Sequence, residues 1–113
     1  MSADIEATLA AVVDRFNRHA ERNPAVAQEL SGIERTIAIR LSTTETYAVD
    51  LRGGRLENLR SSAPARADVT IRTDPDTFRG LVSKDIGPMK AIVTGRLKLE
   101  GSLEDKLLFR KLL

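Results

Sequence analysis

Apolar residues recur at helical spacing over the first part of the chain, and charged residues separate them. One side of a helical wheel collects Ile5, Leu9, Val12, Val13 and Phe16. This pattern predicts one amphipathic helix of about five turns. The pair Asn23-Pro24 then predicts a second, short helix that runs through Leu30, with Asn23 as its N-cap and Gly32 as its end.

The spacing of apolar residues changes from the helical period to strict alternation after Gly32. Alternation over residues 33–41, and again over 47–51, predicts two half-buried strands. Gly53-Gly54 predicts a two-residue hairpin turn, because both central residues of such a turn need positive φ. A third strand over 55–60 and, after a linking loop at 61–66, a fourth strand over 67–71 complete this β-rich part.

Helical and strand signals alternate in the remainder of the chain. A proline among acids at residues 73–76 marks a helix start, and Gly87-Pro88 interrupts that helix. A short helix should then end at Gly95, and alternation over 96–100 predicts a fifth strand.

The last helix carries more apolar surface than a surface helix normally buries. Ser102 and Asp105 have the spacing of a capping box that starts it. Its apolar residues cover more than the usual stripe of about 100°, and they are Leu103, Leu107, Leu108, Phe109, Leu112 and Leu113. Burying each such side chain is worth about 1.5–3 kcal/mol, so we expect something to cover them.

Composition narrows the class of protein. A chain of 113 residues with 42% hydrophobic and 30% charged residues has the balance of one globular domain. No apolar run approaches the ~20 residues that span a bilayer, and the first residues lack the features of a secretory signal. The absence of cysteine removes disulfides and thiolate sites. We therefore expect a cytoplasmic protein without a metal or other cofactor.

Charge and aromatic content indicate whether the chain is suited to contact a membrane or a nucleic acid. Residues 84–113 hold seven basic and four acidic side chains, so the basic excess lies at the C-terminal end. Lys106, Arg110 and Lys111 are candidates for transient contact with an anionic membrane, although a solvated face also explains such an excess. Nucleic-acid binding is not expected, because three Phe and one Tyr, all predicted to point inward, leave no stacking platform.

Residues 67–102 resemble the sterol carrier protein type two family. The resemblance is carried by residues 67–71, by 74–78 and most densely by 88–101, with the sequence PMKAIVTGRLKLEG. The order of predicted elements agrees over nearly the whole chain, and the first 60 residues agree in pattern alone. The resemblance implies one α+β domain over residues 1–113. It also implies a five-stranded, mostly antiparallel sheet with one crossover, and helices packed on one face around an apolar tunnel.

The leading functional hypothesis is non-catalytic binding and intermembrane transfer of a lipid. The family implies a fatty acid, an acyl-CoA, a sterol or a phospholipid as the ligand. We expect the ligand to lie among Phe16, Ile39, Val49, Phe78, Met89, Ile92, Leu103, Leu107 and Leu112. A solid, close-packed core of the same residues is the alternative, and the sequence does not separate the two.

Two further hypotheses use other features of the chain. The surplus apolar surface could instead meet a second copy or a lipid-metabolising enzyme, which would make the chain a dimerisation module or an accessory subunit. The chain could therefore be a monomer or a homodimer. An isomerase or hydrolase would need His19, the only histidine, or a buried acid, but no arrangement of residues supports such a role. A packed or helix-end histidine explains His19.

Overall fold

The computed structural model describes residues 2–42 and 45–112, with the side chains of residues 4–42 and 45–108. Helices and strands follow in the order α1 (Ser2–Arg22), α2 (Pro24–Leu30), β1 (Glu34–Arg40), β2 (Thr46–Arg52), β3 (Arg55–Arg60), β4 (Val69–Arg72), α3 (Pro75–Ser83), α4 (Pro88–Val93), β5 (Lys98–Gly101) and α5 (Leu103–Leu112). Every predicted element is present, and the predicted α+β fold is confirmed. Most strand ends differ from the predicted ones by one or two residues, whereas α3 ends at Ser83, before the predicted interruption at Gly87-Pro88. No helix in these described ranges is long and apolar enough to cross a bilayer.

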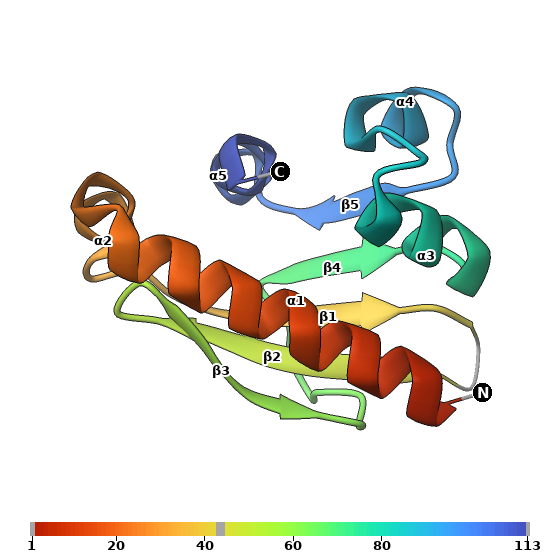
Figure 1. The fold of residues 1–113 in the computed structure, drawn as a ribbon, viewed down its shortest axis with the longest axis horizontal. Coiled ribbons are helices and arrows are strands. Elements are labelled where there is room, and N and C mark those ends of the chain that lie inside the picture. Colours follow the sequence, from red (N-terminus) through yellow and green to blue (C-terminus); the bar gives the residue numbers. More distant parts are fainter. Residues whose placement is uncertain (1, 43–44, 113) are drawn as a thin grey trace.

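All five strands form one sheet in the order β3-β2-β1-β4-β5 (Figure 1). Neighbouring strands are antiparallel except β1 and β4, which run parallel with Ile39 opposite Ile71. Because a parallel pair cannot be joined by a tight hairpin, the chain must cross over between β3 and β4. This is the single crossover that the family resemblance implies.

The core lies between the sheet and α1, which crosses one face of it (Figure 1). Alternate residues of β1 and β2 point to this face and are buried, and α1 contributes Ile5 and Leu9. Tyr47 of β2 is only 1% exposed, and its hydroxyl donates to the Glu45 carboxylate at 2.9 Å. The prediction that this tyrosine points inward is confirmed.

Residues with positive φ occur both in the hairpin turn between β2 and β3 and within β3, where apolar and polar residues alternate irregularly. Gly53 and Gly54 have φ of 56° and 81°, which confirms the predicted two-residue turn. Asn58 within β3 has φ of 58°, and the pairing of β2 with β3 shifts between Ala48 and Asp50. This bulge breaks the alternation of β3.

Two helix starts differ from their predictions. Asn23 occupies the N-cap position of α2, but its side chain makes no capping bond and donates to the His19 carbonyl of α1 at 2.8 Å. The amide thus satisfies the end of the preceding helix, where carbonyls lack partners. The Ser102 hydroxyl caps α5 by accepting from the Asp105 backbone N–H at 3.1 Å, as predicted. The other half of the capping box is replaced, because the Asp105 carboxylate accepts from Arg35 Nε at 2.7 Å.

The ion pair between Arg35 and Asp105 sets the orientation of α5. Asp105 is buried, and Leu108, one turn later on the same side, packs against the core. Leu103 and Leu107 lie elsewhere on the helix and are 74% and 51% exposed. The rest of the chain does not cover these two leucines, because the α5 face that packs inward is the face that carries Asp105. Their covering by a ligand or a partner stays a prediction.

Candidate functional site

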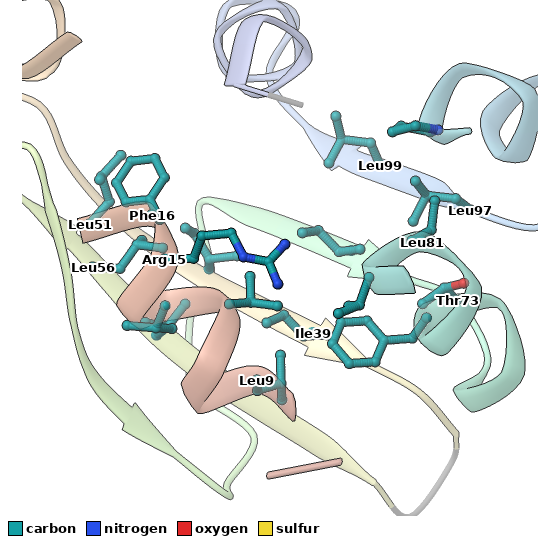
Figure 2. Close-up of a pocket in the computed structure, with 18 of the residues that line it drawn as sticks. Leu9, Arg15, Phe16, Ile39, Leu51, Leu56, Thr73, Leu81, Leu97 and Leu99 are labelled. Atoms are coloured by element: carbon teal, nitrogen blue, oxygen red, sulfur yellow. The ribbon is translucent and has the colours of Figure 1, made fainter. Parts of the chain in front are cut away.

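A cavity of about 320 Å³ lies between α1, the inner face of the sheet, and the α3–α4 region (Figure 2). It is partly open to solvent. Apart from Arg15 and Thr73, its lining is apolar: Leu9, Val12, Val13, Phe16, Ile37, Ile39, Val49, Leu51, Leu56, Ile71, Phe78, Leu81, Val82, Pro88, Ile92, Leu97 and Leu99.

Simple sequence patterns place these side chains around one space. The helical period directs the apolar side of α1 toward the sheet, and alternation along the strands directs every second residue back toward α1. Helix α3 adds a third wall through Phe78, Leu81 and Val82. Gly80 of α3 allows the segment between α3 and α4 to pack closely against this helix, because a Cβ on Gly80 would clash with the Ile86 side chain.

Five of the residues predicted to contact a ligand line this cavity: Phe16, Ile39, Val49, Phe78 and Ile92. Within the described part of the chain, Met89, Leu103 and Leu107 are outside the lining, and Met89 is 45% exposed. The side chains of Leu112, Arg110 and Lys111 are outside the described residues. Lys106 is described, and it is exposed on α5.

Several lining residues were not predicted from the sequence. Ile71 and Leu99 have the alternation that would have placed them on the inner face, and they are partners across β4 and β5. Arg15 has no comparable signal, because it lies at the edge of the apolar side of α1 among other arginines. In Figure 2 its guanidinium extends from α1 over the cavity.

His19 lies outside the cavity on an exposed part of α1. Its Nδ1 is 3.3 Å from the Asn23 amide nitrogen, and it borders a shallow groove with Ala11, Asp14, Arg15, Arg18 and Arg22. It is close to the helix end, as predicted, but it is not packed. No group of three metal-binding side chains occurs among the residues described.

Three solved structures share the fold. A stereoselective inverting sec-alkylsulfatase from Pseudomonas sp. is 26% identical, with a TM-score of 0.58, over 77% of this chain and 14% of that chain. Palmitated SCP2L2 from Aedes aegypti is 18% identical, with a TM-score of 0.58, over 81% of this chain and 87% of that chain. The UbiJ-SCP2 ubiquinone synthesis protein is 15% identical, with a TM-score of 0.59, over 89% of this chain and 87% of that chain. The chain thus spans only a small part of the alkylsulfatase.

No curated protein matches the chain. The sequence model of the SCP-2 sterol transfer family matches residues 14–113, nearly the whole chain. The match confirms the resemblance found in residues 67–102 and supports lipid binding and transfer as the general function. The chain belongs to the SCP-2 sterol transfer family.

Proposed function

We propose that this chain binds one long apolar lipid in the cavity beneath α1, without covalent chemistry, and carries it between membranes. The observation that carries this proposal is the lining, which is apolar at every position except Arg15 and Thr73. Moving a hydrocarbon tail from water onto such a surface is favourable by about 25 cal/mol per Å² of apolar area. The cavity volume of about 320 Å³ lies at the lower end of the range of ligand sites.

The proposal assigns the ligand tail to the lining residues. Phe16, Phe78 and Ile92 would contact it from the helices, and Ile39 and Val49 from the sheet. A fatty acid, an acyl-CoA, a sterol and a phospholipid all have a suitable apolar part, and the Aedes aegypti relative was solved in a palmitated form. We place the protein in the cytoplasm, because a chain without cysteine suits a reducing compartment.

Transfer requires contact with a membrane, and we assign this contact to α5. Leu103 and Leu107 are exposed there, and Lys106 lies between them in sequence. Exposed apolar side chains beside a cation suit the interface of a bilayer with anionic lipids. Arg110 and Lys111 would add positive charge to the same helix.

A binding titration with a variant that fills the cavity tests the proposal. Val12→Phe adds volume at a lining position, whereas Val93→Phe adds the same volume at an α4 position that is 81% exposed. We expect delipidated protein to bind a fluorescent fatty acid or another member of a lipid panel. Val12→Phe should weaken binding about tenfold, because the larger side chain occupies space that the lipid tail would fill and crowds the tail against the other lining residues. Equal affinities for the two variants, or no binding across the panel, would contradict the proposal.

The exposed apolar residues favour a second candidate function. Val93, Leu103 and Leu107 could meet a second copy of the chain or a lipid-metabolising enzyme, because apolar surface of this kind often marks an interface. This candidate predicts a dimer or a complex. Sedimentation that shows a monomer at all concentrations would exclude self-association.

A further inference from the structure

A row of cationic residues crosses the face of the sheet that is turned away from the cavity. Arg40 of β1 is directly opposite Arg72 of β4, and Arg72 is directly opposite Lys98 of β5. These strands are neighbours at one side of the sheet (Figure 1). Ile71 and Leu99, adjacent to two of these cations in sequence, line the cavity, so alternation turns the cations to the opposite face. All three members of this cationic row are exposed.

The stability of the sheet does not explain the cationic row. Like charges at directly opposite positions of neighbouring strands destabilise a sheet. Among the residues that the structure describes, Arg72 has an ion pair, to Glu100 at 2.7 Å, whereas Arg40 and Lys98 have none. The row therefore keeps a surplus of positive charge that opposes folding. A pattern that breaks a rule of sheet stability without a compensating contact is typical of a functional surface.

The spacing of the cationic row matches the spacing of side chains along a helix. Neighbouring strands are about 4.8 Å apart, so the row presents its cations at about this interval along a line across the strands. A helix advances about 5.4 Å per turn, so a helix on this line brings one side chain per turn opposite each cation. We propose that the cationic row binds a partner protein through an acidic helix that lies across β1, β4 and β5. Carboxylates between the cations would remove their mutual repulsion.

A membrane and a nucleic acid also carry regular negative charge, but the face with the cationic row suits them less well. The large apolar side chains that are exposed in the described part of the chain belong to α4 and α5, so the strands offer none for insertion into a bilayer. Of the aromatic residues with described side chains, Phe16 and Phe78 line the cavity and Tyr47 is buried. None of these three is placed to stack on a base.

The test uses short, alanine-rich helical peptides as probes. One peptide has one glutamate per turn along a single side, a second has the same glutamates spread around the helix, and a third has glutamine in their place. A single-stranded oligothymidylate and vesicles of phosphatidylcholine with phosphatidylglycerol represent the other two classes of partner. Each probe is titrated at low salt into the isotope-labelled full-length protein. Changes in the backbone amide NMR signals locate the contact and give the affinity.

Two double variants with the same change of charge accompany the titration. Arg40→Gln with Lys98→Gln removes the two cations without an ion pair, and Arg22→Gln with Lys90→Gln changes exposed positions on α1 and α4. We expect the one-sided glutamate peptide to shift the amide signals of the cationic row. The first double variant should bind it roughly threefold to tenfold more weakly, since each exposed ion pair is weak. The second should lose less than about twofold. Both should stay folded, because exposed positions tolerate substitution.

Each other outcome would overturn a part of the proposal. Equal affinity for the one-sided and the spread glutamate peptides would exclude a helix aligned with the row, and equal losses in the two double variants would reduce the contact to general charge. Tighter binding of the oligothymidylate or of the vesicles at the row would overturn the choice of a protein helix. No change along the row with any probe would overturn the surface itself. None of these results depends on lipid in the cavity, so the proposed function is tested separately.

Discussion

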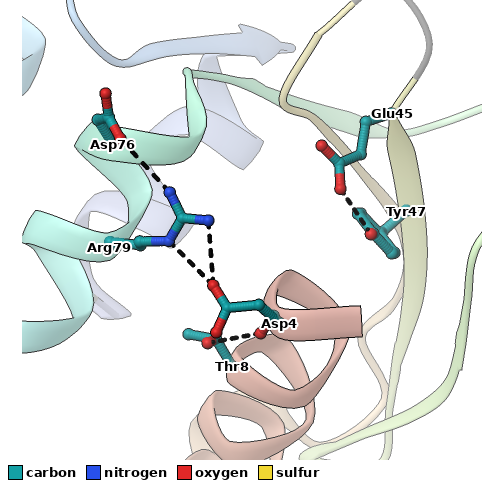
Figure 3. Close-up of polar contacts among 6 residues, drawn as sticks. All are labelled: Asp4, Thr8, Glu45, Tyr47, Asp76 and Arg79. Atoms are coloured by element: carbon teal, nitrogen blue, oxygen red, sulfur yellow. Dashed lines mark hydrogen bonds and ion pairs between the residues drawn. The ribbon is translucent and has the colours of Figure 1, made fainter. Parts of the chain in front are cut away.

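Arg79 of α3 pairs with Asp4 of α1, with Arg79 Nη2 3.0 Å and Nε 3.1 Å from Asp4 Oδ2 (Figure 3). The two residues are 75 positions apart in the chain. Each belongs to a helix that lines the cavity, α1 through Leu9 and α3 through Phe78. The pair therefore joins two walls of the proposed lipid site.

We predict that breaking this pair speeds ligand exchange and changes stability little. Both side chains are largely exposed, and such pairs contribute about 0.2–1 kcal/mol to folding. Arg79→Gln should therefore raise the rate of ligand release roughly twofold to fivefold, on the same scale of energy. Stopped-flow displacement of a bound fluorescent lipid measures this rate. Arg18→Gln, which breaks the exposed pair with Asp14 inside α1, is the matched control and should leave the rate unchanged.

We predict that α5 depends on Asp105 for its position. Asp105→Ala removes the carboxylate that accepts from Arg35 at 2.7 Å and leaves Arg35 without its partner. The loss should be about 2 kcal/mol, because the pair is mostly shielded from water. The pKa of Arg35 is raised by its hydrogen bond to Asp105, which is consistent with a favourable interaction.

Urea unfolding of Asp105→Ala beside Glu104→Ala measures this contribution. Glu104 is in the same turn but is exposed, and its removal should cost less than about 0.5 kcal/mol. Equal midpoints for the two variants would show that the pair with Arg35 does not hold α5. A double variant, Arg35→Met with Asp105→Leu, should recover much of the loss, since it removes both charges of the pair together.

We predict that Asp74 makes stability depend on acid pH. Its carboxylate accepts from the Thr77 hydroxyl at 2.7 Å and from the Thr77 backbone N–H at 2.8 Å, and these bonds lower its pKa below the ordinary value of 3.8. Since the pKa is lower in the folded state, the stabilisation is fully present above pH 3.8 and disappears as pH falls through the folded value.

Asp74→Ala should therefore cost about 1 kcal/mol at neutral pH and less at strongly acid pH. Thermal unfolding of the wild type and of Asp74→Ala, measured from neutral pH downward, shows whether their curves of stability against pH converge. Asp76→Ala in the same helix, at an exposed position, provides the comparison. Parallel curves for the wild type and Asp74→Ala would contradict this assignment.

We predict that α5 governs transfer and not affinity. Leu107→Gln removes an exposed apolar side chain from α5 without touching the described cavity lining. Transfer of a fluorescent lipid to vesicles that contain anionic lipid should slow severalfold, because less apolar area enters the interface. Affinity in solution should stay the same. Val93→Gln, on α4, is the matched control, and equal slowing in both variants would argue against a special role of α5.

Most of the fold could be predicted from local patterns. Alternation around Ile39 and Val49 and the helical period around Phe16 each depend on neighbouring residues alone, so strands and helices were placed correctly. Gly53-Gly54 predicted the hairpin turn, because such a turn needs positive φ at both central residues and glycine adopts positive φ readily.

What the sequence could not provide depends on contacts between distant residues. The outward position of Leu107 follows from the pair between Arg35 and Asp105, which are 70 positions apart. The place of Arg15 at the cavity follows from the arrangement of α1 relative to α3 and β5, which no local pattern encodes. For the same reason, the apolar periodicity of α1 does not distinguish a ligand cavity from a solid, close-packed core.

Native mass spectrometry of the purified protein, before and after extraction with organic solvent, tests the central claim most directly. We predict one lipid molecule per chain before extraction, its removal by solvent, and its return when the lipid is added back. Val12→Phe should carry less lipid than Val93→Phe. Only the mass of the bare chain, in the purified protein and after incubation with a broad lipid panel, would contradict the claim that the space beneath α1 holds a lipid.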